Sequence, residues 1–600
     1  MTAKTIPVSS AAVSWLPRFL QRIENLRRRE DRLALVLSVL IGALVGSVVV
    51  AFILLTGRLA SHIYPAGGGG WRRILAPTLG SLITGYLIFR VFPDARGSGI
   101  PQTRAAIFIH GGRISLRTTV GKFVCCVTSL ASGIALGREG PAVHIGAGIA
   151  SVVARRLGLS KAQVKWLLPV GGAAALSAAF NTPIAAVLFA LEEIMGDMHS
   201  PILGSVVLSS TTAWLVLHLV LGDEPLFHVT PYHLVHPIEL VVYAALGVVG
   251  GLGSVGFVKL LLGLRKRFYR LPRSTVWVQP VVGGLAVGLL GYFVPSVMGV
   301  GYDQVDKVLS GDMVLRVVVT LGILKIFATS ICYASGNAGG IFGPSMFIGA
   351  MMGGMVGHVA RLILPGSTAD PGAYALVGMG TAFAGIIRTP LTSVIMIFEV
   401  TRDYTIIVPL MISNMIAFYI SQRLQREPIY EALAHQDGIH LPTGHFRHRS
   451  RSLLIMEAIR AAPEALAEDT TLNDALAQLR DSPFRSWPVA DSDGFVGMVR
   501  VSDVAAGVAN GEGLATLGDL LADVRASAMT RTGEFTHVHE DQPLGQALAR
   551  MGDTNHSVLP VVSRANVRQL LGIITLPDVL KAYGVERADQ IVTTELTDDE

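Results

Sequence analysis

Charged residues are scarce in this sequence of 600 residues. Asp, Glu, Lys and Arg make up 15% of it, whereas soluble domains average about 25%. Hydrophobic residues make up 51%, so the composition excludes a soluble protein for most of the chain and predicts a membrane protein. The net charge of +6 is modest, and no basic patch is interleaved with aromatic residues. We therefore expect no nucleic-acid partner.

Cysteine is almost absent as well. Cys125, Cys126 and Cys332 lie in apolar stretches and lack the spacing of metal ligands. This pattern argues against a zinc site or a disulfide framework and favours small buried side chains. We expect no metal site.

The N-terminal segment lacks the features of a signal peptide, because its apolar residues alternate with charges and no cleavage pattern follows. Residues 1–32 are expected to be a cytosolic segment with an amphipathic helix near residues 15–28 on the inner membrane surface. Basic residues gather at 22–32 and at 445–451, on both sides of the apolar region. Under the positive-inside rule, both ends of the chain are expected in the cytoplasm.

The apolar region begins with an uncharged run at residues 33–56, which exceeds the roughly 20 residues that span a membrane. Later apolar segments are interrupted by Gly, Pro and Ser at regular intervals. Non-helical backbone at membrane depth persists only where protein or a watery cavity surrounds it. The sequence therefore predicts an all-α polytopic domain of tilted, broken helices whose ends meet inside the protein.

The apolar region also contains a duplication. Residues 137–147 read GREGPAVHIGA and residues 340–350 read GIFGPSMFIGA, with six of eleven positions identical. Residues 170–193 and 377–400 match in the same way, with Glu192 opposite Glu399. We expect two repeat halves at about 33–225 and 237–425. Repeats of this kind commonly place the substrate site near mid-membrane, where broken helices meet.

Three glycine-rich segments end in Gly-Pro or Ile-Pro and are predicted to open helices. They include Glu139 in GREGP and Ser98 in GSGIP. Proline suits the first turn of a helix, and the free N–H groups there attract anions. Glu139 is thus expected to lie where a free anion would also bind. Backbone amides and hydroxyls suit a weakly hydrated anion, because they attract it without a fixed full charge.

The C-terminal part is a different, soluble type of domain, and it is duplicated too. Residues 467–479 parallel residues 539–551, and GMVRVSD at 497–503 parallels GIITLPD at 572–578. Each copy predicts a turn, an amphipathic helix, two strands and a final helix, which indicates an α/β fold.

On four ordered motifs, the chain resembles the CLC family of chloride channels and chloride/proton exchangers. The motifs are GSGIP at Gly97, GREGP at Gly137, GIFGP at Gly340 and a tyrosine, Tyr430, after the last membrane helix. The resemblance covers roughly residues 33–433 and implies an inverted repeat and a homodimer with one pathway per subunit. The tail resembles a pair of CBS domains, at 454–510 and 525–586, after a linker at 434–453 and before an acidic tail at 587–600.

The resemblance also implies roles for single residues. The hydroxyls of Ser98 and Tyr430 and the backbone amides of Ile341 and Phe342 would bind chloride. Glu139 would be the gating glutamate, which enters the pathway when ionised and leaves it when protonated. Serine at position 98 fits the chloride-type pattern, whereas the fluoride-exporting branch typically has methionine there and proline is linked to nitrate preference.

The choice between exchanger and channel depends on the pair Glu192 and Glu193. In the exchangers of this family, the second of the two glutamates commonly transfers protons on the inner side, and Glu193 occupies that position. A purely structural role for Glu193 is the alternative. Glu192 and Glu399 are expected to be structural. Arg138, Lys122 and Lys325 are also expected to be structural, with a positive potential for the anion as the alternative.

In the CBS pair, Thr575 and Asp578 match the pattern in which Thr or Ser approaches a phosphate and Asp holds ribose hydroxyls. In the first copy Asp503 fits, but Arg500 replaces the Thr or Ser. An adenine nucleotide at this pair is one reading, and a packing module without a ligand is the other. No cofactor is expected to be required.

Together these features predict a homodimeric, multi-pass chloride/proton antiporter of the inner (plasma) membrane, modulated by its CBS pair, and not an enzyme. Its partners would be chloride, protons, membrane lipid and a second copy. The first alternative is a passive chloride channel on the same scaffold. A CBS-regulated cation transporter and a membrane sensor are more remote, because a divalent-cation route should show carboxylate or carbonyl ligands and a sensor needs no broken-helix repeat.

Overall fold

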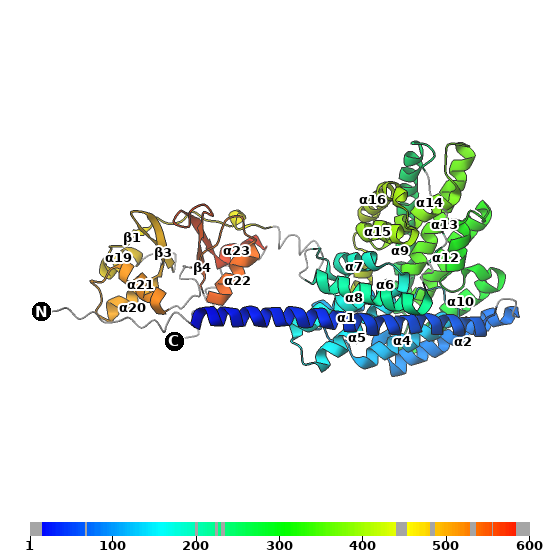
Figure 1. The fold of residues 1–600 in the computed structure, drawn as a ribbon, viewed down its shortest axis with the longest axis horizontal. Helices are drawn as coiled ribbons and strands as arrows, with labels where there is room; N and C mark the ends of the chain where they lie inside the picture. The colour runs from blue at the N-terminus through cyan, green and yellow to red at the C-terminus, as the bar shows by residue number, and fades with distance from the viewer. Residues whose placement is uncertain are drawn as a thin grey trace. The chain divides into compact units, whose positions relative to one another are not determined.

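The computed structural model describes residues 15–65, 69–198, 202–222, 226–227, 229, 234–439, 453–480, 486–527, 536–554 and 556–583. The predicted acidic tail, most of the predicted linker and the first residues of the N-terminal segment lie outside this part of the chain. Two compact units are present, Met1–Leu441 and Pro442–Glu600. Each is described by itself below (Figure 1).

The first unit is helical, as predicted. Its first half contains α1 (Trp15–Ile63), α2 (Gly70–Tyr86), η1 (Leu87–Val91), η2 (Pro93–Ala95), α3 (Ile100–Phe108), α4 (Leu116–Ala131), α5 (Glu139–Arg156), α6 (Lys161–Phe180), α7 (Pro183–Phe189), η3 (Ala190–Met195) and α8 (Leu203–Leu221). Its second half contains α9 (Glu239–Tyr269), η4 (Arg273–Thr275), α10 (Gln279–Phe293), η5 (Pro295–Val297), α11 (Tyr302–Leu309), α12 (Leu315–Ala334), α13 (Phe342–Ile363), α14 (Pro371–Ile386), α15 (Pro390–Thr401), η6 (Tyr404–Ile406), α16 (Ile407–Leu424) and α17 (Ile429–Gln436).

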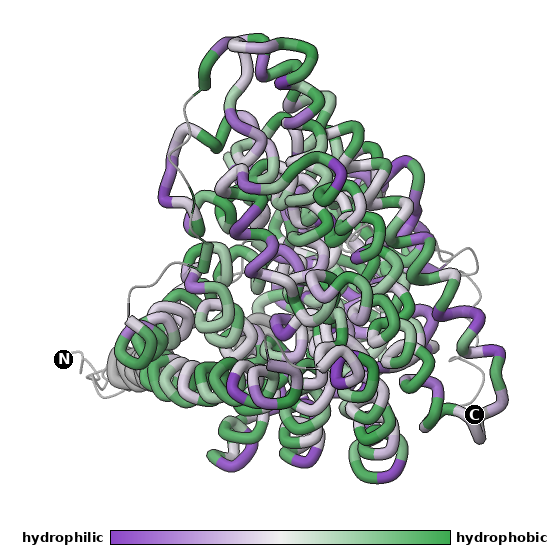
Figure 2. Tube along the Cα trace, turned by 90° about the vertical axis from the view of Figure 1, so that its right-hand side faces the viewer, coloured by the Kyte–Doolittle hydropathy of each residue, from purple (hydrophilic) through white to green (hydrophobic). Residues whose placement is uncertain are grey.

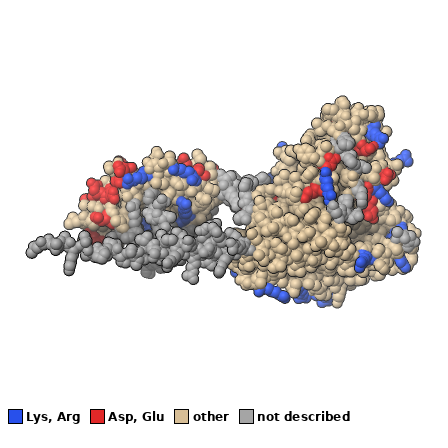
Figure 3. All heavy atoms as spheres, in the orientation of Figure 1, with Lys and Arg blue, Asp and Glu red and all other residues tan. Residues whose placement is uncertain are grey.

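Among the described residues, seven helices are long and apolar enough to cross a membrane. Large hydrophobic side chains such as Leu219, Phe293 and Leu362 are more than 70% exposed. Figure 2 shows hydrophobic residues along the outer helices. The face of this unit drawn in Figure 3 carries a broad area without charged side chains, and the charges lie at its borders. Such a surface suits lipid and not water.

The N-terminal helix differs from the prediction. A separate amphipathic helix was expected near residues 15–28, followed by a membrane span, but α1 is a single helix of 49 residues. Neither glycine nor proline occurs between residues 18 and 41, so nothing in the sequence ends the helix before the span begins. From residue 33 onward α1 runs beside α4, α5, α6 and α8 (Figure 1).

The two halves break their helices at equivalent places. α6 ends at Asn181 and α14 is followed by Arg388, and both residues adopt the left-handed conformation, with φ of 61° and 69°. Thr-Pro follows in each case and starts a new helix, α7 or α15. The long apolar segments read in the sequence are therefore pairs of shorter helices, as the predicted broken helices require.

The short helices α7 and α15 are capped across the repeat. Glu399, at the end of α15, accepts hydrogen bonds from the N–H groups of Ile184 (2.8 Å) and Ala185 (2.6 Å) in α7. Glu192, in η3 after α7, accepts from the N–H of Thr392 at 2.8 Å and from its hydroxyl at 2.6 Å. Carboxylates satisfy helix N-termini well. This reciprocal contact gives both residues the structural role expected of them.

The second unit holds two small sheets, as the duplicated α/β pattern predicts. β1 (Leu466–Ala467) runs parallel to β2 (Ser486–Asp491), and β2 runs antiparallel to β3 (Gly494–Arg500), while β4 (Val558–Val562) pairs antiparallel with β5 (Leu570–Thr575). The helical elements are η7 (Ile455–Glu457), α19 (Leu472–Leu479), α20 (Val501–Ala509), α21 (Leu517–Ser527), α22 (Leu544–Thr554) and α23 (Leu576–Ala582). Pro488 faces Met498 and Pro560 faces Ile573, so the two copies share one strand register.

The helix pairs α5–α6 and α13–α14 cross at equivalent glycines. A Cβ atom added to Gly146 would lie 2.2 Å from the carbonyl oxygen of Gly171, and one added to Gly349 would lie 2.3 Å from that of Gly378. We predict that Gly146→Ala lowers the free energy of unfolding by about 1–3 kcal/mol, because the helices must separate. The loss should appear in thermal unfolding of the detergent-solubilised protein, followed by circular dichroism.

The matched control is Gly57→Ala in α1, where an added Cβ meets no heavy atom within 4 Å. Alanine favours a helix over glycine by about 1 kcal/mol, so this variant should be at least as stable as the parent. Equal stability of the Gly146→Ala and Gly57→Ala proteins would contradict the close crossing.

Candidate functional site

Two glycine-rich loops from the two halves pair at the centre of the helical unit. The N–H of Gly137 donates to the carbonyl of Gly340, and the N–H of Gly340 donates to the carbonyl of Gly137, both at 2.7 Å. This small antiparallel bridge holds the start of α5 against the start of α13. Two helix N-termini, each with free N–H groups, therefore meet inside the protein.

The carboxylate of Glu139 lies in this junction and is fully buried. Its Oε2 accepts a hydrogen bond from the N–H of Gly343 at 3.1 Å, and its Oε1 accepts one from the hydroxyl of Tyr302. The Nε of Arg138 lies 4.0 Å from Oε1. Glu139 thus occupies the N-terminus of α13, a place where a free anion would bind equally well.

Ser98 lies in the loop directly before α3. A Cβ added to Gly140 would lie 2.7 Å from the carbonyl oxygen of Ser98, so the residue after Glu139 touches the loop that carries this serine. The ammonium group of Lys122 donates to the carbonyls of Ala95 (3.0 Å) and Gly97 and fixes the same loop. Within the described part of the chain, Ser98 Oγ is buried and has no hydrogen-bond partner. A buried hydroxyl without a partner is costly unless something else binds it.

The backbone amides of Ile341 and Phe342 lie at the same helix start. Ile341 is the N-cap of α13, and both residues are fully buried. No hydrogen bond among the described residues uses either N–H group. The Phe342 ring packs against the rings of Phe180 and Phe383, at centroid distances of 4.8 and 4.4 Å. Aromatic packing therefore fixes the residue whose amide is free.

Tyr430 comes from α17, and its phenol is fully buried without a hydrogen-bond partner among the described residues. The hydroxyl lies within electrostatic range of Glu139, Glu193 and Tyr333. α17 packs on α3, the helix that follows Ser98, so Tyr430 comes from an element next to one of the helix starts.

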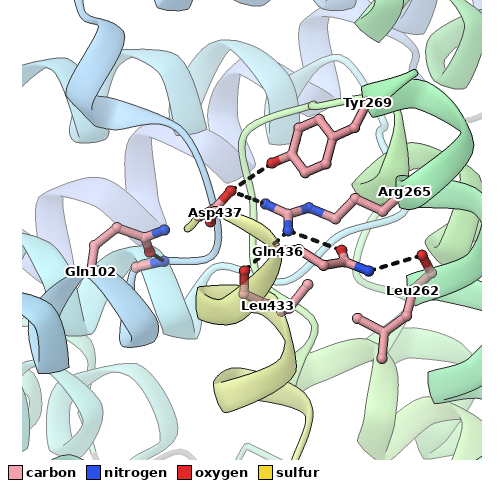
Figure 4. Close-up of polar contacts among 8 residues, drawn as sticks. Gln102, Leu262, Arg265, Tyr269, Leu433, Gln436 and Asp437 are labelled. Atoms are coloured by element: carbon pink, nitrogen blue, oxygen red, sulfur yellow. Dashed lines mark hydrogen bonds and ion pairs between the residues drawn. The ribbon is translucent and has the colours of Figure 1, made fainter. Parts of the chain in front are cut away.

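The end of α17 is fixed by a buried arginine on α9 (Figure 4). Arg265 donates to the carbonyl of Leu433 at 3.2 Å, to Gln436 at 3.1 Å and to Asp437 at 2.7 Å. The hydroxyl of Tyr269 also donates to Asp437, at 2.6 Å. Gln436 also donates to the carbonyl of Leu262 at 3.1 Å. Five hydrogen bonds thus hold the C-terminal end of this eight-residue helix, which carries Tyr430.

The predicted proton residue, Glu193, lies in η3 and is 7% exposed. Arg104 of α3 donates to it at 2.8 Å and to Glu431 of α17 at 3.2 Å. A buried guanidinium between two carboxylates is a strong, charge-assisted arrangement. Glu192 and Glu193 are adjacent in sequence but differ in environment, because the first caps a helix and the second faces this ion cluster.

Three side chains of the site were not predicted. Tyr302 binds Glu139, Arg104 pairs with Glu193, and Tyr333 lies near the hydroxyl and the backbone N–H of Ser98. The approach of Tyr333 falls short of hydrogen-bond geometry, since Ser98 Oγ has no hydrogen-bond partner among the residues that the structure describes. Arg104 could have been identified from the sequence, because it is a charged residue within the apolar run that follows GSGIP. The signal for Tyr302 was its place directly after Gly299-Val-Gly, the counterpart of Gly97-Ser-Gly.

Lys122 and Lys325 have structural contacts, as expected. Lys325 donates to the carbonyls of Val297 at 3.1 Å and Gly299 at 2.6 Å, which repeats the way Lys122 holds its loop. The guanidinium of Arg138 lies 5.4 Å over the ring of Tyr302.

In the second unit, Thr575 and Asp578 form the capping box of α23. The Asp578 carboxylate accepts from Thr575 and also pairs with Arg460. In the first copy, Asp503 is half-buried on α20, and Arg500 lies 3.1 Å from a ring nitrogen of His556 in the other copy. Arg500 therefore already bridges the two copies.

Comparison with known proteins places both units in families. Residues 80–422 match the model described as voltage gated chloride channel, and residues 456–510 and 521–585 match the CBS domain. The H(+)/Cl(-) exchange transporter ClcA of Vibrio campbellii is 31% identical over 357 residues, which is 58% of this chain and 76% of that protein.

Two solved structures share the fold. A slow cyanobacterial Cl⁻/H⁺ antiporter has a TM-score of 0.62 at 24% identity and covers 67% of this chain and 97% of its own. A eukaryotic CLC transporter has a TM-score of 0.59 at 20% identity and covers 91% of this chain and 97% of its own.

The unpartnered hydroxyl of Ser98 gives a prediction about stability. In a buffer whose only anion is large, such as isethionate, Ser98→Ala should unfold at the same temperature as the parent, because no internal hydrogen bond is lost. A small halide, added as sodium bromide, should raise the unfolding temperature of the parent more than that of the variant, because a filled site stabilises the folded state.

Ser177→Ala is the matched control, since Ser177 is also fully buried but donates to the carbonyl of Ser210 at 2.8 Å. This variant should lose about 1 kcal/mol and keep the full response to bromide. An equal response of the parent and Ser98→Ala would show that the hydroxyl binds no anion.

Proposed function

The chain belongs to the voltage-gated chloride channel family, and on that premise we propose that this multi-pass membrane protein exchanges chloride for protons. The observation that carries the proposal is the buried Glu139 carboxylate on the N–H of Gly343. A side chain that occupies an anion position can be displaced by an anion. A carboxylate can also take up a proton, so one residue serves both ions.

Chloride would bind between the hydroxyls of Ser98 and Tyr430 and the amides of Ile341 and Phe342. The unpartnered state of both hydroxyls supports this assignment. Hydroxyls and amides are neutral donors, which bind an anion and still release it. Lys122 and Lys325 are engaged with backbone carbonyls, and the full positive charge near Glu139 is that of Arg138, at 4.0 Å.

Exchange would follow from the competition at α13. When Glu139 is ionised it fills the helix N-terminus and excludes chloride. Protonation removes its charge, and the side chain leaves the position to the anion. Because like charges repel, chloride nearby favours the protonated form of the carboxylate, and by linkage a proton favours chloride to the same extent.

Glu193 would pass protons between Glu139 and the inner side. Its burial and its link through Arg104 to Glu431, the residue next to Tyr430, support this role. The ion pair with Arg104 supports the alternative, a structural carboxylate. The two roles are separated by measuring protons and chloride together.

The assembly and location follow the family resemblance. We infer a homodimer with one pathway per subunit in the inner membrane, with lipid around residues 33–433 and both termini in the cytoplasm. Residues 434–453 would link this domain to CBS copies at 454–510 and 525–586, which would modulate transport.

The decisive measurement uses the full chain in liposomes, with chloride and proton fluxes recorded together. A chloride gradient should drive protons uphill in the parent protein. Glu139→Gln and Glu193→Gln should both abolish proton movement and leave chloride movement, since an amide carries no proton. Glu192→Gln is the matched control: it weakens the cap of α15, costs about 1 kcal/mol and retains the coupling.

Chloride movement without protons in the parent would favour the passive channel on the same scaffold. Transport of cations in preference to anions by the parent protein would favour the cation transporter instead.

An adenine nucleotide at the CBS pair is a second part of the proposal, with Thr575, Asp578 and Asp503 as its contacts. Asp578 would exchange Arg460 for ribose hydroxyls. We expect calorimetry of the full chain with ATP, ADP and AMP to detect binding, and Thr575→Val to weaken it about tenfold, as loss of one charge-assisted hydrogen bond does. Thr516→Val removes a similar cap, Thr516 to Asp519, and should leave binding unchanged. Absence of heat with all three nucleotides would favour the packing module without a ligand.

A further inference from the structure

The loop before Tyr302 repeats the loop that carries Ser98. Lys122 donates to the carbonyls of Ala95 and Gly97, and Lys325 donates to those of Val297 and Gly299. Gly97 and Gly99 have φ of 88° and 108°, and Gly299 and Gly301 have φ of 63° and 90°. A short helix follows each loop, α3 from Ile100 and α11 from Tyr302.

The two loops differ in where they offer a hydroxyl. The residue between the two glycines is Ser98 in the first half and Val300 in the second. The second half therefore lacks the serine hydroxyl, but it has a phenol two residues later, at Tyr302. That phenol reaches the start of α13: its hydroxyl donates to Glu139, and it lies 3.1 Å from the position that a Cβ on Gly343 would take.

The ring of Tyr302 is held from two sides. The ring of Phe227 meets it edge-on at a centroid distance of 5.3 Å, and the guanidinium of Arg138 lies over it at 5.4 Å. Gly301 packs closely on Phe347, since an added Cβ would lie 2.7 Å from that ring. The phenol thus has contacts besides its hydrogen bond to Glu139 and should stay in place when the carboxylate leaves.

We propose that Tyr302 is a ligand of the anion position at the start of α13, where its hydroxyl binds the Glu139 carboxylate and then the chloride that replaces it. The inference rests on the proposed function, because it needs chloride at that position. Tyr302 would then supply a hydroxyl to the anion from the second half, as Ser98 does from the first half. In the parent protein the same hydroxyl holds the carboxylate in place and so slows its exchange for chloride.

The test is a titration of the purified full chain with sodium chloride, followed by calorimetry, in four proteins: parent, Tyr302→Phe, Glu139→Ala and the double variant. Glu139→Ala vacates the position, so chloride should bind there with Tyr302 as a donor. The double variant should bind chloride about tenfold more weakly than Glu139→Ala, the loss expected for one hydrogen bond to a charged group. In liposomes, Tyr302→Phe alone should move chloride several-fold faster than the parent.

Tyr419→Phe is the control, because its phenol is exposed on α16 and should change neither quantity. Equal chloride affinity of Glu139→Ala and the double variant would show that Tyr302 is not a ligand of the anion. Unchanged chloride flux in Tyr302→Phe would show that the Tyr302 hydroxyl does not keep the Glu139 carboxylate in place. If the phenylalanine variant does not give monodisperse protein, Tyr302→Met, which also lacks a hydroxyl, goes through the same titration. If the proposed chloride/proton exchange is wrong, the parent protein will move no protons in the liposome measurement, and this result is distinct from the two above.

Discussion

The structure depends on carboxylates that bind helix N-termini of the opposite repeat. Glu192 binds the start of α15, Glu399 binds the start of α7 and Glu139 binds the start of α13. A helix that begins inside a membrane protein has N–H groups that lipid cannot satisfy. A carboxylate satisfies them and also meets the positive end of the helix dipole.

The three contacts differ in strength, and the difference separates structure from function. Glu192 and Glu399 each accept from two neighbouring residues of the capped helix, at 2.6–2.8 Å for the shorter bonds. Glu139 accepts from a single N–H of α13, at 3.1 Å, and depends on the Tyr302 hydroxyl for its other oxygen. The carboxylate with the fewest backbone donors is the one proposed to move.

Much of this arrangement could be predicted from the sequence, because it is repeated. The GREGP and GIFGP segments indicate helix starts, and their duplication indicates that two such starts share a location. Glu139 and Ser98 follow from those local patterns.

The partners that lie far apart in the sequence could not be predicted in this way. Nothing near Glu139 in the sequence points to Tyr302, which is 163 residues away, and nothing near Glu193 points to Arg104 or Glu431. Such pairs are set by tertiary packing, within the first half for Arg104 and Glu193 and between the halves for the other pairs, whereas sequence patterns report local backbone preferences. The unbroken α1 was missed for a related reason: the change from charged to apolar residues near position 33 suggested a boundary, although no helix-breaking residue lies there.

Arg104 shows how closely the two proposed ion routes are joined. It lies on α3, whose start follows Ser98, and it pairs with Glu431, the residue next to Tyr430, as well as with Glu193. One guanidinium thus connects both elements that carry the hydroxyls proposed to bind the anion to the carboxylate proposed for protons. A change of charge on Glu193 alters how Arg104 is shared between two buried carboxylates, and one of them belongs to the helix of Tyr430. Communication between the proton and anion positions therefore needs no long chain of residues, because a single side chain spans the three elements.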